Sequence, residues 1–267
     1  MTEMQSLLQV SGLCAGYSRG DVLRDVSFTL RKGEILCVVG ESGCGKSTLL
    51  KALMGVDDAV HITGGTVTLE GRELTALSRR ERQRLCRDRM GMIFQNPGAS
   101  FDPIRTYGAQ FRDTLKGHGK FRKERFAADA AAAFDRLGLT DSGRILASRP
   151  YELSGGMNQR AAMALALLLE QDILLADEPT SALDAVIQLQ AARQLKQLSR
   201  TEGIAQLVVT HDLALARFLA GRIAVLYEGR FVEYGDTETV LHAPGHPYTK
   251  KLLQAVPRLE RGEGACP

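Results

Sequence analysis

The residues from Gly40 to Ser47 have the types and the spacing needed to hold the phosphate groups of a nucleotide. They fit the pattern GxxxxGK[ST], which binds phosphate when a strand precedes it and a helix follows it. Glycines let the backbone N–H groups of such a loop face phosphate oxygens, and the positive end of the following helix favours an anion. Lys46 is predicted to reach the β- and γ-phosphates of ATP, and the hydroxyl of Ser47 to ligate Mg²⁺. We therefore expect the nucleotide to be bound by Gly40, Glu41, Ser42, Gly43, Cys44, Gly45, Lys46, Ser47 and Thr48.

A pair of carboxylates follows a later apolar run and could complete such a site. The run Ile173-Leu-Leu-Ala ends in Asp177 and Glu178, and Pro179 then prevents further strand pairing. Asp177 is predicted to hold Mg²⁺ through water, and Glu178 to orient or deprotonate the attacking water. Taken alone, this pattern is also typical of an ion pair at a strand end. The phosphate loop earlier in the chain favours the catalytic interpretation.

Short apolar segments around these motifs are predicted to be strands that position them. They are VSFTL (26–30), EILCVVG (34–40), GTVTLEG (65–71), MGMIFQ (90–95), DILLADEP (172–179), QLVVTHD (206–212) and RIAVLYEG (222–229). The runs ILCVV and ILLA are continuously apolar, as expected of strands covered on both faces of a parallel sheet. Helices are predicted over 46–56, 123–137 and 185–200, and residues from about 96 to 170 contain no convincing strand. The pattern indicates an α/β core with a helical insertion.

The composition is that of an ordinary globular protein and excludes several other classes. Hydrophobic residues make up 44% and charged residues 24% of the 267 residues. The net charge of +3 argues against a dedicated nucleic-acid binder, and the arginines between 79 and 89 are interleaved with acidic residues, as on a solvated helix face. No apolar run approaches the roughly 20 residues of a membrane-spanning helix, and no signal peptide is recognised. The five cysteines show no metal-ligand spacing, so free thiols in a reducing cytoplasm are expected.

The segment Leu153-Ser-Gly-Gly-Met157 separates this chain from most ATPases and kinases. It stands immediately before a predicted helix and ahead of the acidic strand, and here the chain resembles the ATP-binding cassette family, whose signature is LSGG followed usually by Gln. The resemblance implies that Ser154, Gly155 and Gly156 form a second anion site, which closes in trans over ATP held by another subunit. Met157 replaces the usual Gln and removes a polar contact. We expect this replacement to have little effect on anion binding, because Ser154 and the backbone make the anion site.

The other motifs of the family follow in the expected order. The resemblance implies that Tyr17 stacks on the adenine, although an ordinary half-buried tyrosine is the alternative. Gln95 matches the glutamine that ligates Mg²⁺ and links it to the helical subdomain, and His211 matches the switch histidine that contacts the γ-phosphate. The segment 181–184 matches the loop that communicates across the dimer, so Asp184 is expected to act in trans. The implied catalytic residues are Glu178, His211 and Gln95, and the implied metal ligands are Ser47, Gln95 and Asp177.

The resemblance covers roughly residues 7 to 255 and implies a fold, a domain layout and partners. The expected fold is an α/β P-loop NTPase core of the RecA-like type, with an antiparallel β portion and an inserted α-helical subdomain. The expected units are an ATP-binding core (1–95 and 170–235), a helical signature subdomain (96–169) and a C-terminal helical tail (236–267). The expected partners are a second ABC ATPase subunit in a heterodimer, two transmembrane permease subunits and an extracytoplasmic substrate-binding protein acting through the permease, with no nucleic acid. The expected location is peripheral, on the cytoplasmic face of the inner membrane.

Two segments resemble one importer branch of the family. NPGASFDPIRTYGAQF follows Gln95, and HAPGHPYTKKLLQAVP lies near the C-terminus. Both are similar to segments of the branch that imports peptides, nickel and metal chelates, and the Phe-Asp-Pro at 101–103 with LSGGM resembles its nickel and metallophore ATPases. Nickel or a nickel chelate is therefore the leading cargo, and a di- or oligopeptide the alternative. A non-transport ABC ATPase is a remote alternative, because such proteins carry two cassettes or long coiled coils.

Cys44 lies inside the phosphate loop and could be reactive. Lys46 and the helix start should favour its thiolate, so alkylation is expected to inactivate the protein and ATP to protect it. The alternative is an inert small residue.

Overall fold

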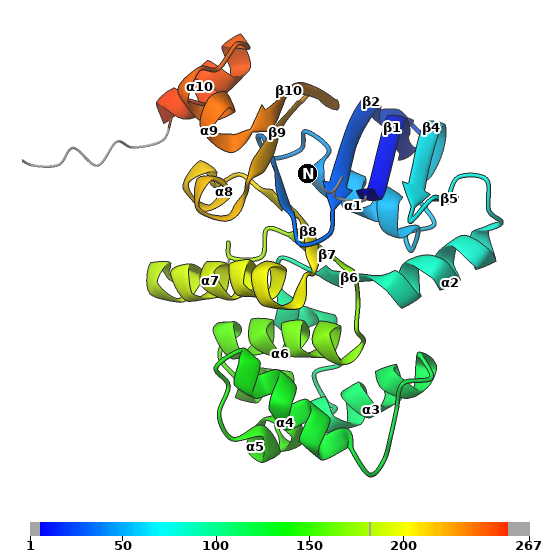
Figure 1. Ribbon diagram of the computed structural model, residues 1–267, viewed down its shortest axis with the longest axis vertical. Coiled ribbons are helices and arrows are strands. Elements are labelled where there is room, and N and C mark those ends of the chain that lie inside the picture. Colours follow the sequence, from blue (N-terminus) through cyan, green and yellow to red (C-terminus); the bar gives the residue numbers. More distant parts are fainter. Residues whose placement is uncertain (1–5, 182, 256–267) are drawn as a thin grey trace, which may run out of the picture.

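The computed structural model describes residues 6–181 and 183–255, and its main feature is a six-stranded sheet (Figure 1). The strands are ordered β10 (Arg230–Asp236), β9 (Arg222–Tyr227), β3 (Ile35–Val39), β8 (Ala205–Thr210), β7 (Ile173–Asp177) and β6 (Met90–Ile93). The strands from β9 to β6 are parallel, and only β10 in this sheet is antiparallel to its neighbour. The carboxyl ends of the parallel strands therefore meet at one edge.

A second, antiparallel sheet packs over the helix that follows β3. Its order is β2 (Gly20–Arg31), β1 (Ser6–Tyr17), β4 (His61–Leu69) and β5 (Arg72–Glu73). Helix α1 (Lys46–Met54) contacts both sheets, and Leu49, Leu50 and Leu53 are fully buried between them. The predicted antiparallel portion of the α/β core is therefore present.

The helices of the insertion lie on the far side of α7 from the main sheet (Figure 1). Between β6 and β7 come η1 (Pro97–Ser100), α3 (Tyr107–Gly117), α4 (Phe126–Arg136), α5 (Ser142–Ala147), η2 (Pro150–Glu152) and α6 (Gly155–Leu168). The remaining helices are α2 (Arg79–Arg89), α7 (Ala185–Glu202), α8 (Leu213–Leu219), α9 (Thr237–His242) and α10 (Pro247–Ala255). The division into units at 95, 169 and 235 remains a proposal.

Strand β3 shows why a continuously apolar run is needed here. Ile35, Cys37 and Val39 belong to the core shared with α7, α8 and the inserted helices. Leu36 and Val38 point the other way, into the core shared with α1 and the antiparallel sheet. All of these side chains are buried, because successive residues of a strand face opposite sides and both sides are covered. The phosphate loop thus begins directly after a strand whose side chains are packed on both faces.

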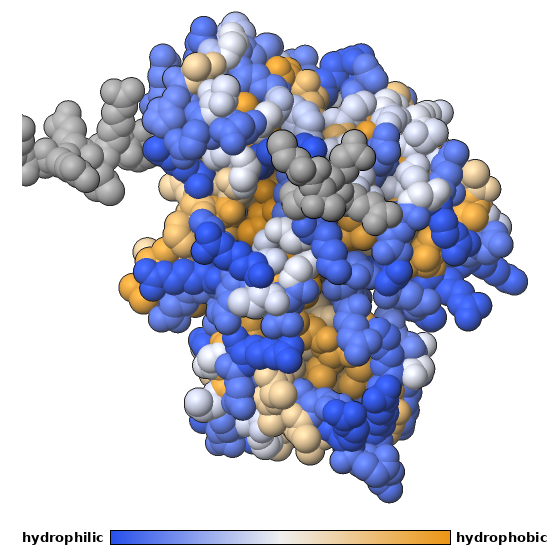
Figure 2. All heavy atoms as spheres, viewed as in Figure 1, coloured by the Kyte–Doolittle hydropathy of each residue, from blue (hydrophilic) through white to orange (hydrophobic). Residues whose placement is uncertain are grey.

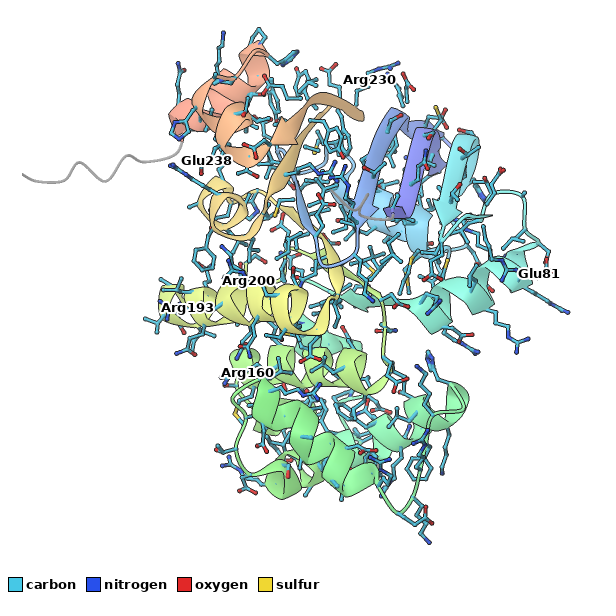
Figure 3. The ribbon with its side chains drawn as sticks, in the orientation of Figure 1. Glu81, Arg160, Arg193, Arg200, Arg230 and Glu238 are labelled. Carbon is cyan, nitrogen blue, oxygen red and sulfur yellow. The ribbon has the colours of Figure 1, made fainter. Side chains whose placement is uncertain are left out.

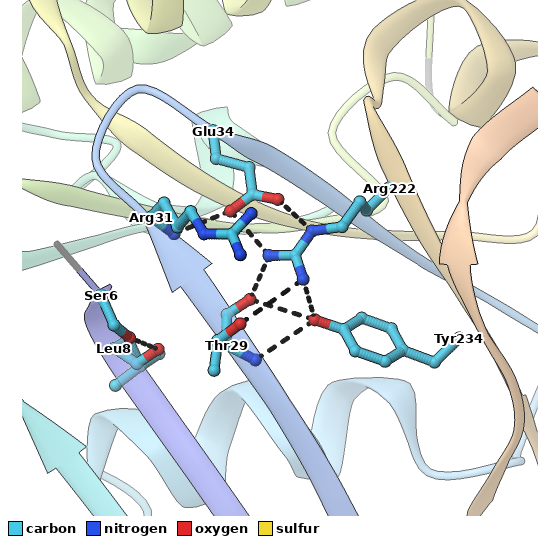
Figure 4. A network of polar contacts seen from close by, with 7 residues as sticks. All are labelled: Ser6, Leu8, Thr29, Arg31, Glu34, Arg222 and Tyr234. Atoms are coloured by element: carbon cyan, nitrogen blue, oxygen red, sulfur yellow. Dashed lines mark hydrogen bonds and ion pairs between the residues drawn. The ribbon is translucent and has the colours of Figure 1, made fainter. Parts of the chain in front are cut away.

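A polar network joins the two sheets at the amino ends of the parallel strands (Figure 4). Arg222 begins β9, and its Nη2 donates to Glu34 Oε2 at 2.8 Å and to the carbonyl oxygen of Thr29 on β2 at 2.7 Å. Tyr234 of β10 contacts the same guanidinium and donates to the Thr29 carbonyl at 3.3 Å. The side chains of Arg222 and Glu34 are only 20% and 11% exposed, so this ion pair is well protected from solvent. The network holds β2 against β9 and β10, at the edge opposite to the phosphate loop.

The α/β class and the P-loop core are confirmed, but β1, the two-residue β5 and β10 were not predicted as strands. β1 escaped because Gly12 adopts a left-handed φ of 61° and the pairing shifts register, which interrupts the alternation. β10 was not predicted because it is an edge strand without a fully buried residue, so its sequence shows no alternation of buried and exposed positions. β6 ends at Ile93, which leaves Gln95 on the following loop. The helices α9 and α10 follow Asp236, and the end of the predicted tail, from 256, lies outside the described residues.

Candidate nucleotide-binding and hydrolysis site

The parallel strands bring the predicted catalytic segments to one edge of the main sheet. β3 leads into the phosphate loop, β8 beside it leads to His211, and β7 beside β8 ends at Asp177. β6, the last strand of the row, leads to Gln95. A cavity of about 440 Å³ lies there, lined by Ser42, Gly43, Gly45, Lys46, Ser47, Thr48, Gln95, Asp177, Glu178 and His211. Every residue expected to be catalytic or to ligate the metal therefore lines the same cavity.

The ammonium of Lys46 is held inside the phosphate loop. Its Nζ donates to the carbonyl oxygens of Gly40 at 2.8 Å and Glu41 at 2.9 Å, and the residue is only 6% exposed. The third donor of the ammonium faces Sγ of Cys44 at 4.0 Å, a weak acceptor that a phosphate oxygen can replace. Gly45 caps α1 with a φ of 111°, which a residue with a Cβ rarely adopts. A buried cation beside the start of a helix makes a favourable site for phosphate.

The metal ligands expected from the sequence offer oxygen atoms from three segments. The hydroxyl of Ser47 donates to Oδ1 of Asp177 at 3.1 Å, and Gln95 faces the same cavity. Burial raises the pKa of Asp177, and the charge of Glu178 adds to the rise, while the hydrogen bond from Ser47 opposes it. Hydroxyl, carboxylate and amide oxygens are the ligands that Mg²⁺ prefers, and a cation would relieve the desolvated carboxylate. These residues therefore fit a magnesium ion.

Replacing Asp177 with asparagine is expected to stabilise the nucleotide-free protein while abolishing hydrolysis. The amide removes a desolvated charge beside Glu178 but can still accept the hydrogen bond from Ser47. We expect the midpoint of thermal unfolding in EDTA to rise by about 1–4 °C, because about 1 kcal/mol shifts a domain of this size by a few degrees. Differential scanning calorimetry of both proteins measures this change. A lower midpoint would show that the carboxylate stabilises the empty site.

Glu178 and His211 contact each other across the cavity. Nδ1 of His211 lies 2.7 Å from Oε2 of Glu178, whose side chain is 16% exposed, while that of His211 is 60% exposed. The backbone of Glu178 has a φ of 44°, and its N–H donates to the carbonyl oxygen of Val209 at 2.9 Å. Such a left-handed conformation is uncommon outside glycine and asparagine, so the bond to β8 holds it in place. The carboxylate is thus aimed into the cavity, and the exposed imidazole has room to turn toward a phosphate.

Tyr17 lies beside the cavity rather than in its lining. It ends β1, and its hydroxyl is 3.5 Å from Oγ1 of Thr48 in the first turn of α1. The residue as a whole is partly exposed. Stacking of its ring on adenine stays a prediction.

The residues expected to act in trans lie apart from this cavity. Ser154, Gly155 and Gly156 are at the start of α6 and Asp184 precedes α7, and within the described chain none of them lines the cavity. Oγ of Ser154 accepts from the N–H of Met157 at 3.3 Å and caps α6. The Met157 side chain packs against the hydrophobic core. A second anion site at the start of α6 is therefore compatible with a nucleotide held by another subunit.

Close packing fixes the start of α6 against its neighbours. A Cβ on Gly156 would lie 2.7 Å from Cγ2 of Ile187 on α7, so a larger residue would push the two helices apart. Arg160 projects from α6 (Figure 3) and donates from Nε to the Gly156 carbonyl at 3.2 Å and from Nη1 to the Gly138 carbonyl at 3.3 Å. Sequence reasoning missed Arg160, because an arginine on a helix gives no signal until its distant partner is known. These contacts join the signature segment to α7 and to the turn after α4.

The expectation of a reactive Cys44 thiolate is wrong. Burial raises the pKa of the Cys44 thiol, and this effect outweighs the opposing charge of Lys46. The ammonium of Lys46 lies 4.0 Å from the sulfur and its charge lowers the pKa, but the effect of burial is larger. The protonated thiol, which is a poor nucleophile, is the dominant form at neutral pH.

We expect iodoacetamide to alkylate Cys44 more slowly than glutathione in the same neutral buffer, with a rate that rises as the pH is raised. Mass spectrometry of the peptide containing Cys44 measures the rate. If Cys44 were alkylated faster than glutathione, it would be a reactive thiolate after all, as the sequence predicts. Cys37, buried in β3, serves as an internal reference, because burial raises its thiol pKa far above the usual range.

The described residues contain neither a membrane span nor a metal cluster. No helix in 6–181 and 183–255 has both the length and the apolar character needed to cross a bilayer. Over the same residues, no group of at least three His, Cys, Asp or Glu side chains could hold a metal ion. The cysteines at 14, 37, 44 and 86 are free thiols, as expected, and Cys266 lies outside the described residues.

Comparison with known proteins decides the family. The sequence model described as "ABC transporter" matches residues 23–181, which is more than half of the chain. The chain belongs to the ABC transporter family. ATP is therefore its nucleotide and ATP hydrolysis its reaction. A second model, described as "Oligopeptide/dipeptide transporter, C-terminal region", matches residues 232–266.

Individual relatives of this ABC protein span almost all of the chain. The dipeptide transport ATP-binding protein of Bacillus subtilis (strain 168) is 38% identical over 263 residues, which is 96% of this chain and 78% of that protein. The oligopeptide transport ATP-binding protein of Escherichia coli (strain K12) is 38% identical over 262 residues, 97% of this chain and 78% of that protein. Among solved structures, a dimeric ATP-binding cassette in a post-hydrolysis state, bound to ADP and Pi, has a TM-score of 0.75 at 29% identity. The match covers 86% of this chain and 98% of that one.

Proposed function

We propose that this ABC ATP-binding subunit drives the uptake of di- or oligopeptides through separate permease subunits. The observation that carries the proposal is the match of residues 232–266 to the C-terminal region of oligopeptide/dipeptide transporters. The dipeptide and oligopeptide transport ATP-binding proteins described above support it, because their similarity extends over nearly the whole chain. Similarity that reaches beyond the nucleotide site is more informative about the branch than motifs that all ABC ATPases share.

A peptide replaces nickel as the cargo that we favour. The Phe-Asp-Pro at 101–103 favoured it, but the relatives above are named for peptides. In the structure, Phe101 packs edge-on against Tyr107 with ring centroids 4.7 Å apart, and the N–H of Asp102 donates to Oε1 of Gln110 at 2.8 Å. This segment therefore serves packing within the inserted helices. Such a packing role does not depend on the cargo.

The cavity supports a direct hydrolysis mechanism. The carboxylate of Glu178 accepts a proton from water while the water oxygen bonds to the γ-phosphorus. The bond from that phosphorus to the β–γ bridging oxygen breaks, and ADP and inorganic phosphate leave. Lys46 compensates the phosphate charge, His211 is placed to donate a hydrogen bond to the γ-phosphate, and Ser47 and Asp177 are placed to hold Mg²⁺. Magnesium, when bound, neutralises charge on the phosphate oxygens.

A second cassette is needed to complete the site. Ser154, Gly155, Gly156 and Asp184 lie outside the cavity of their own chain, so they are available to a nucleotide bound by a partner. ATP draws the two cassettes together and hydrolysis lets them separate. We infer a heterodimer with a second ABC ATPase subunit, as expected for this importer branch.

An apolar groove next to Gln95 offers a contact for the permease. A cavity of about 310 Å³ opens between β6, the end of α1 and α6, and Val56, Phe94 and Leu165 are in its lining. Val56 is 54% and Phe94 43% exposed, and Figure 2 shows apolar surface between α2 and the helices below it. Exposed apolar side chains in a groove favour a protein partner, and Phe94 adjoins Gln95 in the chain. We infer that a cytoplasmic segment of the permease docks here.

This docking would place the subunit on the cytoplasmic face of the inner membrane, as a peripheral protein. Two permease subunits would form the pathway, and an extracytoplasmic binding protein would deliver the peptide to them. No nucleic-acid partner is proposed.

Uptake measurements test the cargo. Cells lacking this gene are supplied with a labelled dipeptide, a labelled longer peptide and radioactive nickel, and are rescued with wild type or the Glu178→Gln variant. We expect peptide uptake to be lost and to return only with wild type, with nickel uptake unchanged. Loss of nickel uptake alone would return the protein to the nickel branch. Unchanged uptake of all three would reject the peptide proposal.

A further inference from the structure

The C-terminal helix α10 reaches back to the phosphate loop through one tyrosine. The hydroxyl of Tyr248 accepts a hydrogen bond from the backbone N–H of Glu41 at 2.9 Å. The two residues are 207 positions apart in sequence, and neither the sequence motifs nor the mechanism above assigns a role to Tyr248. Its segment, His246-Pro-Tyr-Thr249, falls within the region that resembles peptide transporters.

Tyr248 is held rigidly enough to position the loop. The residue is 7% exposed, and its ring packs at a tilt against that of Tyr227 at the end of β9, with centroids 4.1 Å apart and planes at 32°. Its backbone N–H donates to Nδ1 of His246 at 3.2 Å, and the N–H of His246 in turn contacts the carboxylate of Glu233 on β10. The position of the hydroxyl is therefore set by contacts with β9 and β10 of the main sheet.

The peptide group between Gly40 and Glu41 is held from both of its ends. Its N–H donates to Tyr248, and its carbonyl oxygen, which belongs to Gly40, accepts from Nζ of Lys46 at 2.8 Å. The N–H and C=O of a trans peptide point in opposite directions within one rigid plane. Rotation of this plane would therefore move the carbonyl away from the ammonium. Neither Gly40 nor Glu41 lines the cavity, so Tyr248 acts on the loop from behind.

We propose that Tyr248 is a positioning residue for Lys46. By orienting the Gly40–Glu41 peptide, it fixes the carbonyl that holds the ammonium, so the phosphate loop is ordered before ATP arrives. Order that exists before binding lowers the entropy lost on binding. The inference rests on the ATP site of the proposed function and is independent of the cargo.

The Tyr248→Phe variant removes the hydroxyl and keeps the ring that packs against Tyr227. A neutral hydrogen bond contributes modestly, so we expect the Kd for ATP to rise about two- to tenfold. The bond supports the loop in the ground state and in the transition state alike. The variant should therefore raise KM for ATP with little change in kcat, as loss of uniform binding does.

The test measures ATP binding to the full-length chain by titration, and hydrolysis by the assembled transporter. Tyr234→Phe is the matched control, because it also removes a tyrosine hydroxyl with structural hydrogen bonds, but at the opposite edge of the sheet. We expect the control to bind ATP as wild type does. An equal rise in Kd for both variants would show that loss of either hydroxyl loosens the fold in general, and would overturn the proposal. Unchanged ATP binding by Tyr248→Phe would also overturn it.

A double-mutant cycle separates positioning from packing. In the Lys46→Ala background the carbonyl of Gly40 no longer holds an ammonium, so Tyr248→Phe should add little further loss of binding. The same fold-change in both backgrounds would show that Tyr248 acts independently of Lys46 and would overturn the inference. Wild-type protein that fails to bind ATP would instead reject the nucleotide site itself.

Discussion

Glu178→Gln is expected to slow ATP hydrolysis by about 10²- to 10⁴-fold, the usual contribution of a general base, while ATP binding persists. The amide has nearly the shape of the carboxylate but cannot accept a proton from water at neutral pH. It can still contact Nδ1 of His211, which lies 2.7 Å from the carboxylate in the wild type. The nucleotide should therefore stay bound, and the closed pair of cassettes should accumulate. Phosphate release measures the rate, and size-exclusion chromatography with ATP measures the closed pair.

The Glu170→Gln variant is a matched control for this substitution. Glu170 also has a left-handed backbone, with a φ of 49°, but it lies outside the cavity and pairs with Lys120 at 3.1 Å. Its side chain is 79% exposed, so loss of the charge should leave hydrolysis nearly unchanged. Normal turnover by the Glu178→Gln variant would refute the assignment of the general base.

Lys46→Ala is expected to weaken ATP binding about 10- to 100-fold, because hydrogen bonds to charged groups contribute about 1.5–3 kcal/mol. Removal of the buried ammonium also leaves the carbonyl oxygens of Gly40 and Glu41 without their donor. The loop should then lose order as well as charge, so hydrolysis should become undetectable at ATP concentrations that saturate the wild type. Titration with ATP and a phosphate-release assay measure the two effects.

Lys51→Ala tests whether removal of any lysine from α1 weakens ATP binding as much as Lys46→Ala does. Lys51 lies on the same helix, pairs with Asp57 at 3.0 Å and does not line the cavity. Its loss should change the Kd for ATP by less than about threefold, as for a partly exposed ion pair. If both variants bound ATP equally well, Lys46 would have no special role in the site.

The nucleotide site was predictable because each of its parts has a local signature. A phosphate loop needs glycines and a lysine at fixed spacing, since its shape arises within a few residues of backbone. The carboxylates of Asp177 and Glu178 follow a strand whose continuous apolar character shows that it is buried. Parallel strands then carry their ends to one edge, so Gln95 and His211 reach the same cavity from other parts of the chain.

Features that depend on distant partners were missed or misjudged. The thiol pKa of Cys44 could not be predicted from its neighbours in sequence, because burial by the fold outweighs the charge of Lys46. The edge strand β10 lacks fully buried side chains, and its pairing with β9 is visible only once the turn between them is folded. The segment at 101–103 makes its contacts within the inserted helices, Phe101 with Tyr107 and Asp102 with Gln110, so its resemblance to nickel ATPases does not identify the cargo.

The sequence by itself therefore determined the family and the candidate chemistry of this protein: a loop of the phosphate-binding type, two carboxylates at a strand end, and the signature typical of ABC ATPases. These follow from short-range backbone geometry and from strand periodicity, which adjacent residues control. Only the tertiary structure decided that burial raises the pKa of the Cys44 thiol, and that the hydroxyl of Tyr248 accepts a hydrogen bond from the phosphate loop. Such contacts join residues far apart in the chain, so their energies depend on how the sheets and helices pack, and no local pattern encodes them.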